Sequence, residues 1–321
     1  MVRAMRLAAL FAACAVLPAC GSDGAGSPTD ASDPTGDASP TDGSLTDAAC
    51  TTPAACDWLE AYQREVVGKL AGAQEIAPGV TLAHRSSATE REHARVYLLA
   101  ELDRLGIPAE RHAYRASGTN VVGTLAPADG TPAGAGLIVI GAHLDRVAAG
   151  PGAADNATGV SIVLAAARYL REVPGRRHPV AFVLFDEEEL GLIGSKAYAA
   201  RLVTEQVPVA AVHAFDMLSY DMDGDRAIEL WSPVAALEAA YREHGLAAGV
   251  PIQPVTFSRS DHQAFLDRGL PAVGIGEEFA ADDHTPHYHQ ATDTYDRIDF
   301  TYLTASTRFA LGVIEAGVTA P

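Results

Sequence analysis

The sequence is poor in cysteine and in basic side chains, and each scarcity excludes a class of protein. Four cysteines among 321 residues are too few for a fold that is built from disulfide bonds. Only 23 Lys and Arg stand against 41 Asp and Glu, which gives a net charge of −18. Because nucleic acids and anionic surfaces bind through cationic side chains, we expect no nucleic-acid partner. A hydrophobic content of 48% and a charged content of 20% are those of a globular protein, not of a disordered chain or a multi-span membrane protein.

The first twenty residues have the pattern of an export signal. Two arginines precede an apolar run over residues 7–17, which is too short to cross a bilayer, since a spanning helix needs about 20 residues. The run ends in Leu-Pro-Ala-Cys20, which is similar to the bacterial lipobox, although Pro18 is unusual at its position. We therefore predict a lipoprotein-type signal over residues 1–20. Cys20 would be the lipid anchor of an exported cell-envelope protein that faces the periplasm or the cell surface, with the membrane as a partner through this anchor only. The alternative is an ordinary signal peptide that is cleaved near Ala19.

A polar segment follows the signal. Residues 21–49 are small and polar, with six Asp and no Lys or Arg, so they cannot bury enough apolar surface to offset the entropy of ordering. We predict a disordered tether over residues 21–56. Cys50 and Cys56 lie at its end, and in an exported protein a disulfide between them is expected, with two free thiols as the alternative.

A regular alternation of helical and strand patterns begins at residue 57 and predicts one catalytic domain over residues 57–321. Ser87-Ala-Thr-Glu90 has the form of a capping box at the start of a helix. Alternating strands and helices predict an α/β fold, a three-layer sandwich with a mostly parallel mixed central sheet that helices cover on both faces. The expected strands cover 137–141, 180–185 and 210–215, and the expected helices cover 58–70, 87–105, 160–170, 190–202, 235–244, 261–267 and 300–316.

Candidate metal ligands follow the predicted strands at their carboxyl ends, where ligand sites of open α/β sheets lie. Imidazole together with carboxylate is the ligand set of hydrolytic zinc. Each piece alone is ordinary, because a strand-end His is more often structural and an acidic run is more often a solvated face. Their order and placement together favour a metal site. The candidates are His143, Asp145, Asp155, the acidic run 186–189, Asp216 and His289.

The motifs around these residues resemble those of the M28 family of di-zinc metallopeptidases, best known from secreted bacterial aminopeptidases. The most specific piece is Glu-Glu-x-Gly-Leu-x-Gly-Ser, which ends at Ser195. The resemblance covers about residues 60–315 and implies a zinc-peptidase (phosphorylase/hydrolase-like) fold. The matching stretches are Gly-Ala-His143-Leu-Asp145, Pro-Gly-Ala-Ala-Asp155-Asn-Ala-Thr-Gly, Leu-Phe-Asp-Glu-Glu188-Glu-Leu-Gly-Leu-Ile-Gly-Ser195, Phe-Asp216-Met, Ser-Asp261-His and His289-x-x-x-Asp293-Thr.

The resemblance implies two Zn²⁺ per chain and a role for each ligand. Asp155 would bridge both ions. His143 and Asp216 would complete one metal position, and Glu189 and His289 the other. In the family the peptide bond after the bridging Asp is often cis, so the same is expected after Asp155.

The resemblance also implies roles for residues around the metals. Glu188 would be the general base, and Asp145 would orient the first histidine ligand through a hydrogen bond. Tyr288 would stabilise the oxyanion, and Arg259 would help to hold the substrate terminus. In the family the loop often has two acids in this place. This chain has Ala154 at the first position and keeps the second, the bridging ligand Asp155.

These roles imply a zinc aminopeptidase that hydrolyses the N-terminal peptide bond of a substrate with a free amino terminus. A water that bridges the two metals would attack the scissile carbonyl and give its proton to Glu188. The alternatives are a related carboxypeptidase or amidohydrolase, a glutaminyl-cyclase-like enzyme, and a non-catalytic surface lipoprotein.

Overall fold

The computed structural model describes residues 50–128 and 136–321, which belong to one compact unit. The predicted signal, Cys20 and residues 21–49 of the predicted tether lie outside the described residues. Within those described ranges, no helix has both the length and the apolarity that a bilayer span requires.

The described chain begins with a disulfide between Cys50 and Cys56. The two cysteines flank the short helix η1 (Pro53–Ala55), and Cys56 is fully buried. Trp58 donates its indole N–H to the Sγ atom of Cys50 at 2.8 Å. Residues 50–56, the end of the predicted tether, therefore pack onto the folded unit.

Two of the described α-helices, α2 and α7, begin directly after a residue whose side chain caps the helix. At the start of α2 the Ser87 hydroxyl accepts a hydrogen bond from the backbone N–H of Glu90, which is one half of the expected capping box, and it donates to the Glu90 carboxylate. At the start of α7 the Asp299 carboxylate accepts from two backbone N–H groups. The α-helices are α1 (Leu59–Leu70), α2 (Ala88–Arg104), α3 (Gly159–Leu170), α4 (Ile193–Thr204), α5 (Ala235–Ala248), α6 (His262–Leu266) and α7 (Phe300–Thr319).

The strands form one eight-stranded mixed sheet in the order β1-β2-β4-β3-β5-β8-β6-β7. The four central strands β4, β3, β5 and β8 are parallel, so their carboxyl ends meet at one edge. Antiparallel pairings join β2 to β4 and β6 to β8. The strands are β1 (Ala109–Ala113), β2 (Thr119–Leu125), β3 (Leu137–His143), β4 (Val180–Phe185), β5 (Val209–Phe215), β6 (Ile228–Trp231), β7 (Ile252–Val255) and β8 (Ala272–Gly276).

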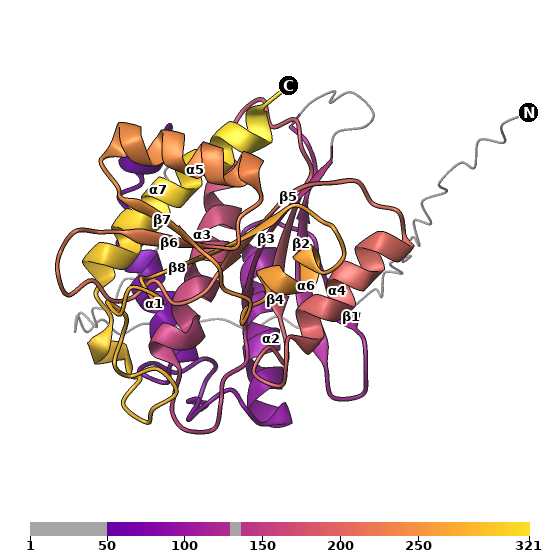
Figure 1. Ribbon diagram of the computed structural model, residues 1–321. Helices are drawn as coiled ribbons and strands as arrows, with labels where there is room; N and C mark the ends of the chain where they lie inside the picture. Colours follow the sequence, from indigo (N-terminus) through magenta and orange to yellow (C-terminus); the bar gives the residue numbers. More distant parts are fainter. Residues whose placement is uncertain (1–49, 129–135) are drawn as a thin grey trace, which may run out of the picture. The chain divides into compact units, whose positions relative to one another are not determined.

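Helices cover both faces of the sheet, so the predicted three-layer α/β sandwich is confirmed. Figure 1 shows α1, α3, α5 and α7 on one side of the sheet and α4 and α6 on the other. Side chains of β4 alternate between the two layers, since Phe182 belongs to the core cluster with α1, α3 and α7, and Val183 belongs to the cluster with α4 and α6. A sheet that is buried on both faces holds its strand ends firmly, and the candidate ligands lie at these ends.

The two edge strands are the least buried. β1 has the sequence Ala-Glu-Arg-His-Ala and is mostly exposed, and β7 contains Pro254. The sequence analysis did not predict β1, β2, β6, β7 or β8. The edge strand β1 is polar, β6 and β7 have four residues each, and β8 contains two glycines, so these strands have no long apolar run.

Candidate metal centre

Side chains from three neighbouring strand ends and two loops converge at the carboxyl edge of the sheet. His143 is the last residue of β3, Asp216 directly follows β5, and the acidic run 186–189 directly follows β4. Asp155 lies in the turn η2 (Ala153–Thr158) that leads into α3, and His289 lies in the loop before α7. The structure thus brings together all five predicted metal ligands.

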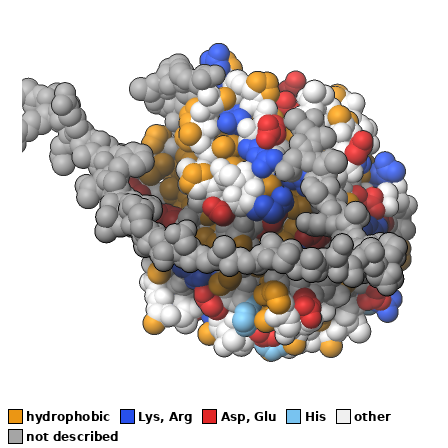
Figure 2. All heavy atoms as spheres, turned by 180° about the vertical axis from the view of Figure 1, so that it is seen from behind, with side chains coloured by type: hydrophobic (Ala, Val, Ile, Leu, Met, Phe, Trp, Pro, Cys, Tyr) orange, Lys and Arg blue, Asp and Glu red, His pale blue; other side chains and the backbone are white. Residues whose placement is uncertain are grey.

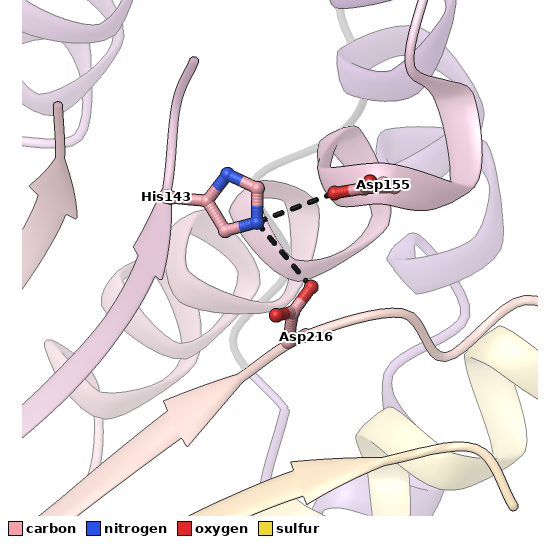
Figure 3. Close-up of side chains that lie close together, drawn as sticks. All are labelled: His143, Asp155 and Asp216. Carbon is pink, nitrogen blue, oxygen red and sulfur yellow. Dashed lines mark hydrogen bonds and ion pairs between the residues drawn. The ribbon is translucent and has the colours of Figure 1, made fainter. Parts of the chain in front are cut away.

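The first group of ligands is His143, Asp155 and Asp216. The Nε2 atom of His143 lies 3.3 Å from Oδ1 of Asp155 and 3.4 Å from Oδ1 of Asp216. Figure 3 shows one ring nitrogen facing both carboxylates. All three side chains are buried.

The second group is Asp155, Glu189 and His289. The Nε2 atom of His289 lies 3.2 Å from Oδ2 of Asp155 and 3.1 Å from Oε2 of Glu189. Asp155 therefore turns one carboxylate oxygen to each histidine. This division is what a carboxylate that bridges two metal positions requires.

The spacing of these atoms fits zinc. With zinc–ligand bonds of about 2.0–2.1 Å in a tetrahedron, neighbouring donor atoms lie about 3.3 Å apart. The four donor distances in the two groups are 3.1 to 3.4 Å. Histidine nitrogen with carboxylate oxygen is also the donor chemistry of a hydrolytic zinc site.

The negative charge of the clustered carboxylates dominates the electrostatics of the site and would attract a cation. Burial alone would lower the pKa of His143, but the carboxylates of Asp216 and Glu188 outweigh it and raise that pKa well above its usual value. Hydrogen bonds to Asp155 and Glu189 raise the pKa of His289 to about 9. Burial opposes ionisation of Asp155, yet hydrogen bonds from the two histidines hold its pKa below its ordinary value.

Glu188 is next to the ligands and lies in neither of the two groups. One of its carboxylate oxygens lies within 4.8 Å of a His143 ring nitrogen and of a Glu189 carboxylate oxygen. The side chain is buried, and burial together with the charges of Asp261 and Asp216 raises its pKa, although His143 acts in the opposite direction. Glu188 is therefore a buried carboxylate with a raised pKa that lies beside the candidate ligands.

Asp145 contacts more than the histidine that the resemblance assigned to it. The Nδ1 atom of His143 lies 3.3 Å from the backbone oxygen of Asp145 and 3.7 Å from its carboxylate. That carboxylate accepts hydrogen bonds from the backbone N–H groups of Glu188 and Glu189, at 3.0 and 3.2 Å. Asp145 therefore holds the turn after β4 against the end of β3.

The first half of the acidic run is neither a solvated face nor part of the two ligand groups. The side chains of Asp186 and Glu187 are fully buried. Arg91 and Arg95 each form an ion pair with Asp186 at 2.8 Å, and Arg115 forms one with Glu187 at 2.7 Å. These carboxylates are buried because three arginines neutralise them.

The loop of the bridging ligand is held by residues to which the sequence analysis gave no role. Asp293 accepts hydrogen bonds from the backbone N–H groups of Ala154 and Asp155, at 2.7 and 3.2 Å. The fully buried Arg85 donates to the backbone oxygens of four residues, two of them in the same loop. The Asp155–Asn156 peptide bond is cis, as the resemblance implied.

Two further residues at this edge also had no predicted role. Ser260 donates its hydroxyl to Oδ2 of Asp216 at 2.8 Å, which orients that ligand. Glu277 follows β8 directly and is fully buried, and it accepts hydrogen bonds from the backbone N–H groups of Ser219 and Thr285. Burial raises the pKa of Glu277 to about 8. The sequence signal that could have indicated a role for Glu277 is its position directly after a strand, as for the candidate ligands.

The predicted substrate residues lie beside the metal ligands. The ring of Tyr288 stacks on that of His289, with centroids 3.9 Å apart. The exposed Arg259 places its guanidinium 5.2 Å from the Phe257 ring and 5.6 Å from the Phe279 ring. Phe279 in turn contacts Tyr288 at 5.3 Å. The rings of Phe279 and Tyr288 therefore form an aromatic surface between Arg259 and His289.

A cavity of about 530 Å³ lies elsewhere, between α5, α7 and η1, and none of the predicted ligands lines it. Figure 2 shows acidic and basic side chains interleaved on the face seen from behind, where described atoms are visible.

Comparison with known proteins gives a family match over most of this unit. The profile of peptidase family M28 matches residues 120–314. The probable lipoprotein aminopeptidase LpqL of Mycobacterium tuberculosis is 34% identical over 219 residues, which are 59% of this chain and 42% of that protein. The chain therefore matches less than half the length of this curated relative.

Solved structures share the fold. The LapA aminopeptidase of Legionella pneumophila superposes with a TM-score of 0.68 at 22% identity, over 81% of this chain and 74% of that one. A glutaminyl cyclase of Porphyromonas gingivalis gives 0.66 at 17% identity, over 81% and 98%. Since one fold here serves two activities, the function must be argued from the site.

Proposed function

This chain belongs to peptidase family M28, and from that premise we propose that it is a zinc-dependent aminopeptidase. The proposed substrate is a peptide with a free amino terminus, and the proposed cofactor is two Zn²⁺ per chain. The aminopeptidase name of the M. tuberculosis relative supports the proposal.

The observation that carries the proposal is the division of Asp155 between two ligand groups. Its Oδ1 and Oδ2 atoms face different histidines, and each group contains a second carboxylate. A single-metal site would need one such group. The proposed ligands are His143, Asp155 and Asp216 at the first position and Asp155, Glu189 and His289 at the second.

The chain's own residues divide the chemistry among them. When bound, a pair of zinc ions polarises the scissile carbonyl and lowers the pKa of water. The Glu188 carboxylate takes the proton of the attacking water and passes it to the leaving amine. The Asp145 carboxylate accepts a hydrogen bond from the backbone N–H of Glu188 and so holds that residue in place, and Ser260 orients Asp216.

Two residues are proposed to contact substrate. Tyr288 lies against His289, and we assign its hydroxyl to the oxyanion that forms at the carbonyl. Arg259, at the end of the aromatic surface, would hold a substrate terminus.

We also propose that the protein is an exported lipoprotein with Cys20 as its anchor. The lipobox-like pattern and the lipoprotein name of the relative support this. Replacing Cys20 with Ser should release the protein from membranes with unchanged specific activity. A wild-type protein that is already free of membranes and starts at another residue contradicts the anchor.

The test of the activity combines metal content with substrate choice. We expect about two zinc ions per chain by elemental analysis, and cleavage of aminoacyl chromogenic substrates only when the amino group is free. A blocked substrate that is cleaved equally well points to a carboxypeptidase or amidohydrolase. An amino-terminal Gln peptide that cyclises with loss of ammonia points to a glutaminyl cyclase, and a protein without zinc or turnover points to a binding module.

A further inference from the structure

A buried arginine lies beside one of the two proposed metal positions and not beside the other. The inference concerns Arg146, whose side chain is fully buried, and it rests on the metal site proposed above. Its Nη1 atom lies 3.4 Å from Oδ2 of Asp155 and 3.5 Å from Oε1 of Glu189. Both residues are ligands of the second position, and Asp155 turns toward Arg146 the same oxygen that faces His289.

The first position differs in this respect. The Nε2 atom of His143 faces Oδ1 of Asp155 and Oδ1 of Asp216. Among the described residues, Arg146 forms no ion pair with Asp216, and it contacts Asp155 through Oδ2. The remaining carboxylate near Arg146 is Asp293, 3.8 Å from its Nε atom. The cation is thus placed on one side of the bridging ligand.

Arg85, which lies before α2 and contacts the same loop, provides a comparison. Both arginines are fully buried, but Arg85 satisfies its guanidinium with backbone oxygens at 2.6 to 2.9 Å. Arg146 has two nitrogens, Nε and Nη2, without a hydrogen-bond partner among the described residues. Arg85 therefore serves the backbone, whereas Arg146 is held mainly by the charge of the ligand carboxylates.

The backbone makes room for this side chain. Gly152 has a φ of 72°, and a Cβ atom added there would lie 2.4 Å from Cδ and 2.7 Å from Cγ of Arg146. A side chain at position 152 would displace the stem of Arg146. The turn before Asp155 is therefore shaped around the arginine.

From this geometry we infer that Arg146 is the built-in counter-cation of the second metal position. A guanidinium stays charged at every physiological pH. It stabilises the metal-free carboxylates of Asp155 and Glu189, and it repels a cation that binds to them, because like charges repel more strongly away from bulk water. The two positions therefore differ in affinity, with zinc bound more weakly at Asp155, Glu189 and His289 than at His143, Asp155 and Asp216.

The test is a competition titration of the metal-free full chain with Zn²⁺ against a chromophoric chelator. Wild type should show a tight and a weak step, and His289→Ala should lose the weak one. Arg146→Met removes the charge and keeps an apolar stem, so it should tighten the weak step by about tenfold or more. The same variant should lower the Tm of the metal-free protein, because two buried carboxylates lose their cation.

These opposite changes separate a counter-cation from a merely structural residue. Arg85→Met, the matched control, should lower the Tm without tightening either zinc step, and Arg146→Lys should keep the weak step near its wild-type affinity. Two equal steps in wild type, or a weak step that Arg146→Met leaves unchanged or loosens, overturns the inference. If Arg146→Met does not fold, the number and strength of the zinc steps in wild type and in Arg146→Lys still test the inference. If wild type binds no zinc, the proposed function fails together with the inference, whereas zinc binding that is insensitive to Arg146 overturns the inference alone.

Discussion

Asp186 and Glu187 stand next to Glu188 and Glu189 in the chain, yet the two pairs face different partners. The first pair turns into an arginine cluster of α2 and the loop after β1, where each carboxylate has a fixed cation. The second pair turns toward His143 and the metal positions. Backbone direction decides the partner, since Glu187 has a φ of 61° and the turn that follows is held by Asp145. A run of like charges can therefore contain a structural half and a reactive half.

The largest expected effect tests the reactive half. Glu188→Gln removes the proton acceptor and leaves every proposed ligand in place. Because general-base catalysis contributes about 10²–10⁴-fold, kcat should fall by at least that lower figure with two zinc ions retained. The measurement is kcat on a free-amino-terminus substrate together with zinc per chain. Full activity in this variant removes Glu188 from the mechanism.

Glu189→Gln tests the ligand beside the base. A neutral amide binds zinc less well than a carboxylate, so zinc content should fall toward one ion per chain and activity should fall with it. Elemental analysis after dialysis separates this variant from Glu188→Gln. If both variants keep the same zinc content, the roles of the two residues are not divided as proposed.

Glu187→Gln tests the structural half. On a solvated acidic turn this substitution would be nearly silent, but the Glu187 side chain is fully buried and pairs with arginine. Glu187 is buried and also pairs with the buried Arg91 at 3.3 Å, whereas Arg115 is 41% exposed. We therefore expect the unfolding free energy to fall by more than the loss of an exposed pair would cause, with activity per folded molecule retained. Glu110→Gln is the control, because its pair with Arg201 is largely exposed and contributes at most about 1 kcal/mol. Equal stability of the two variants would contradict the comparison.

Glu277 extends the comparison to a buried acid that forms no ion pair with any of the described residues. Its pKa is about 8 in the folded protein against an ordinary 4.5, so between these values the folded state keeps a proton that the unfolded state releases. This group's contribution to stability therefore falls as pH rises through that window, by at most about 1.4 kcal/mol per pH unit. Glu277→Gln should flatten the dependence of unfolding free energy on pH, measured on metal-free protein from pH 5 to 8. An unchanged slope contradicts a protonated Glu277.

The sequence predicted the parts of the fold that have a continuous pattern. The expected strand 180–185 is β4 residue for residue, because a parallel strand buried on both faces is an unbroken apolar run. β1 had no such signal, because its side chains are polar and face solvent. Of the five predicted ligands, which all converge in space, His143, Glu189 and Asp216 do so because strand ends of a parallel sheet share one edge.

The surroundings of the ligands could not be predicted in the same way. Arg146, Arg85 and Arg91 are buried beside the site, but nothing in their local sequence separates them from surface arginines. Their burial depends on carboxylates and carbonyls that come from distant segments, such as the loop at Pro151 for Arg85. The positions that carry chemistry had a pattern, whereas the cations that tune them did not.

The edge strands set the limit of the sheet. An open edge presents unpaired backbone groups to which another strand can add, and this is a common route to aggregation. β1 carries Glu110, Arg111 and His112 along its exposed edge, and Pro254 removes one N–H donor from β7. A second copy that approached either edge would have to desolvate charges or leave a carbonyl unpaired. The eight-stranded sheet is therefore protected against edge-to-edge growth, even where many copies are held close together.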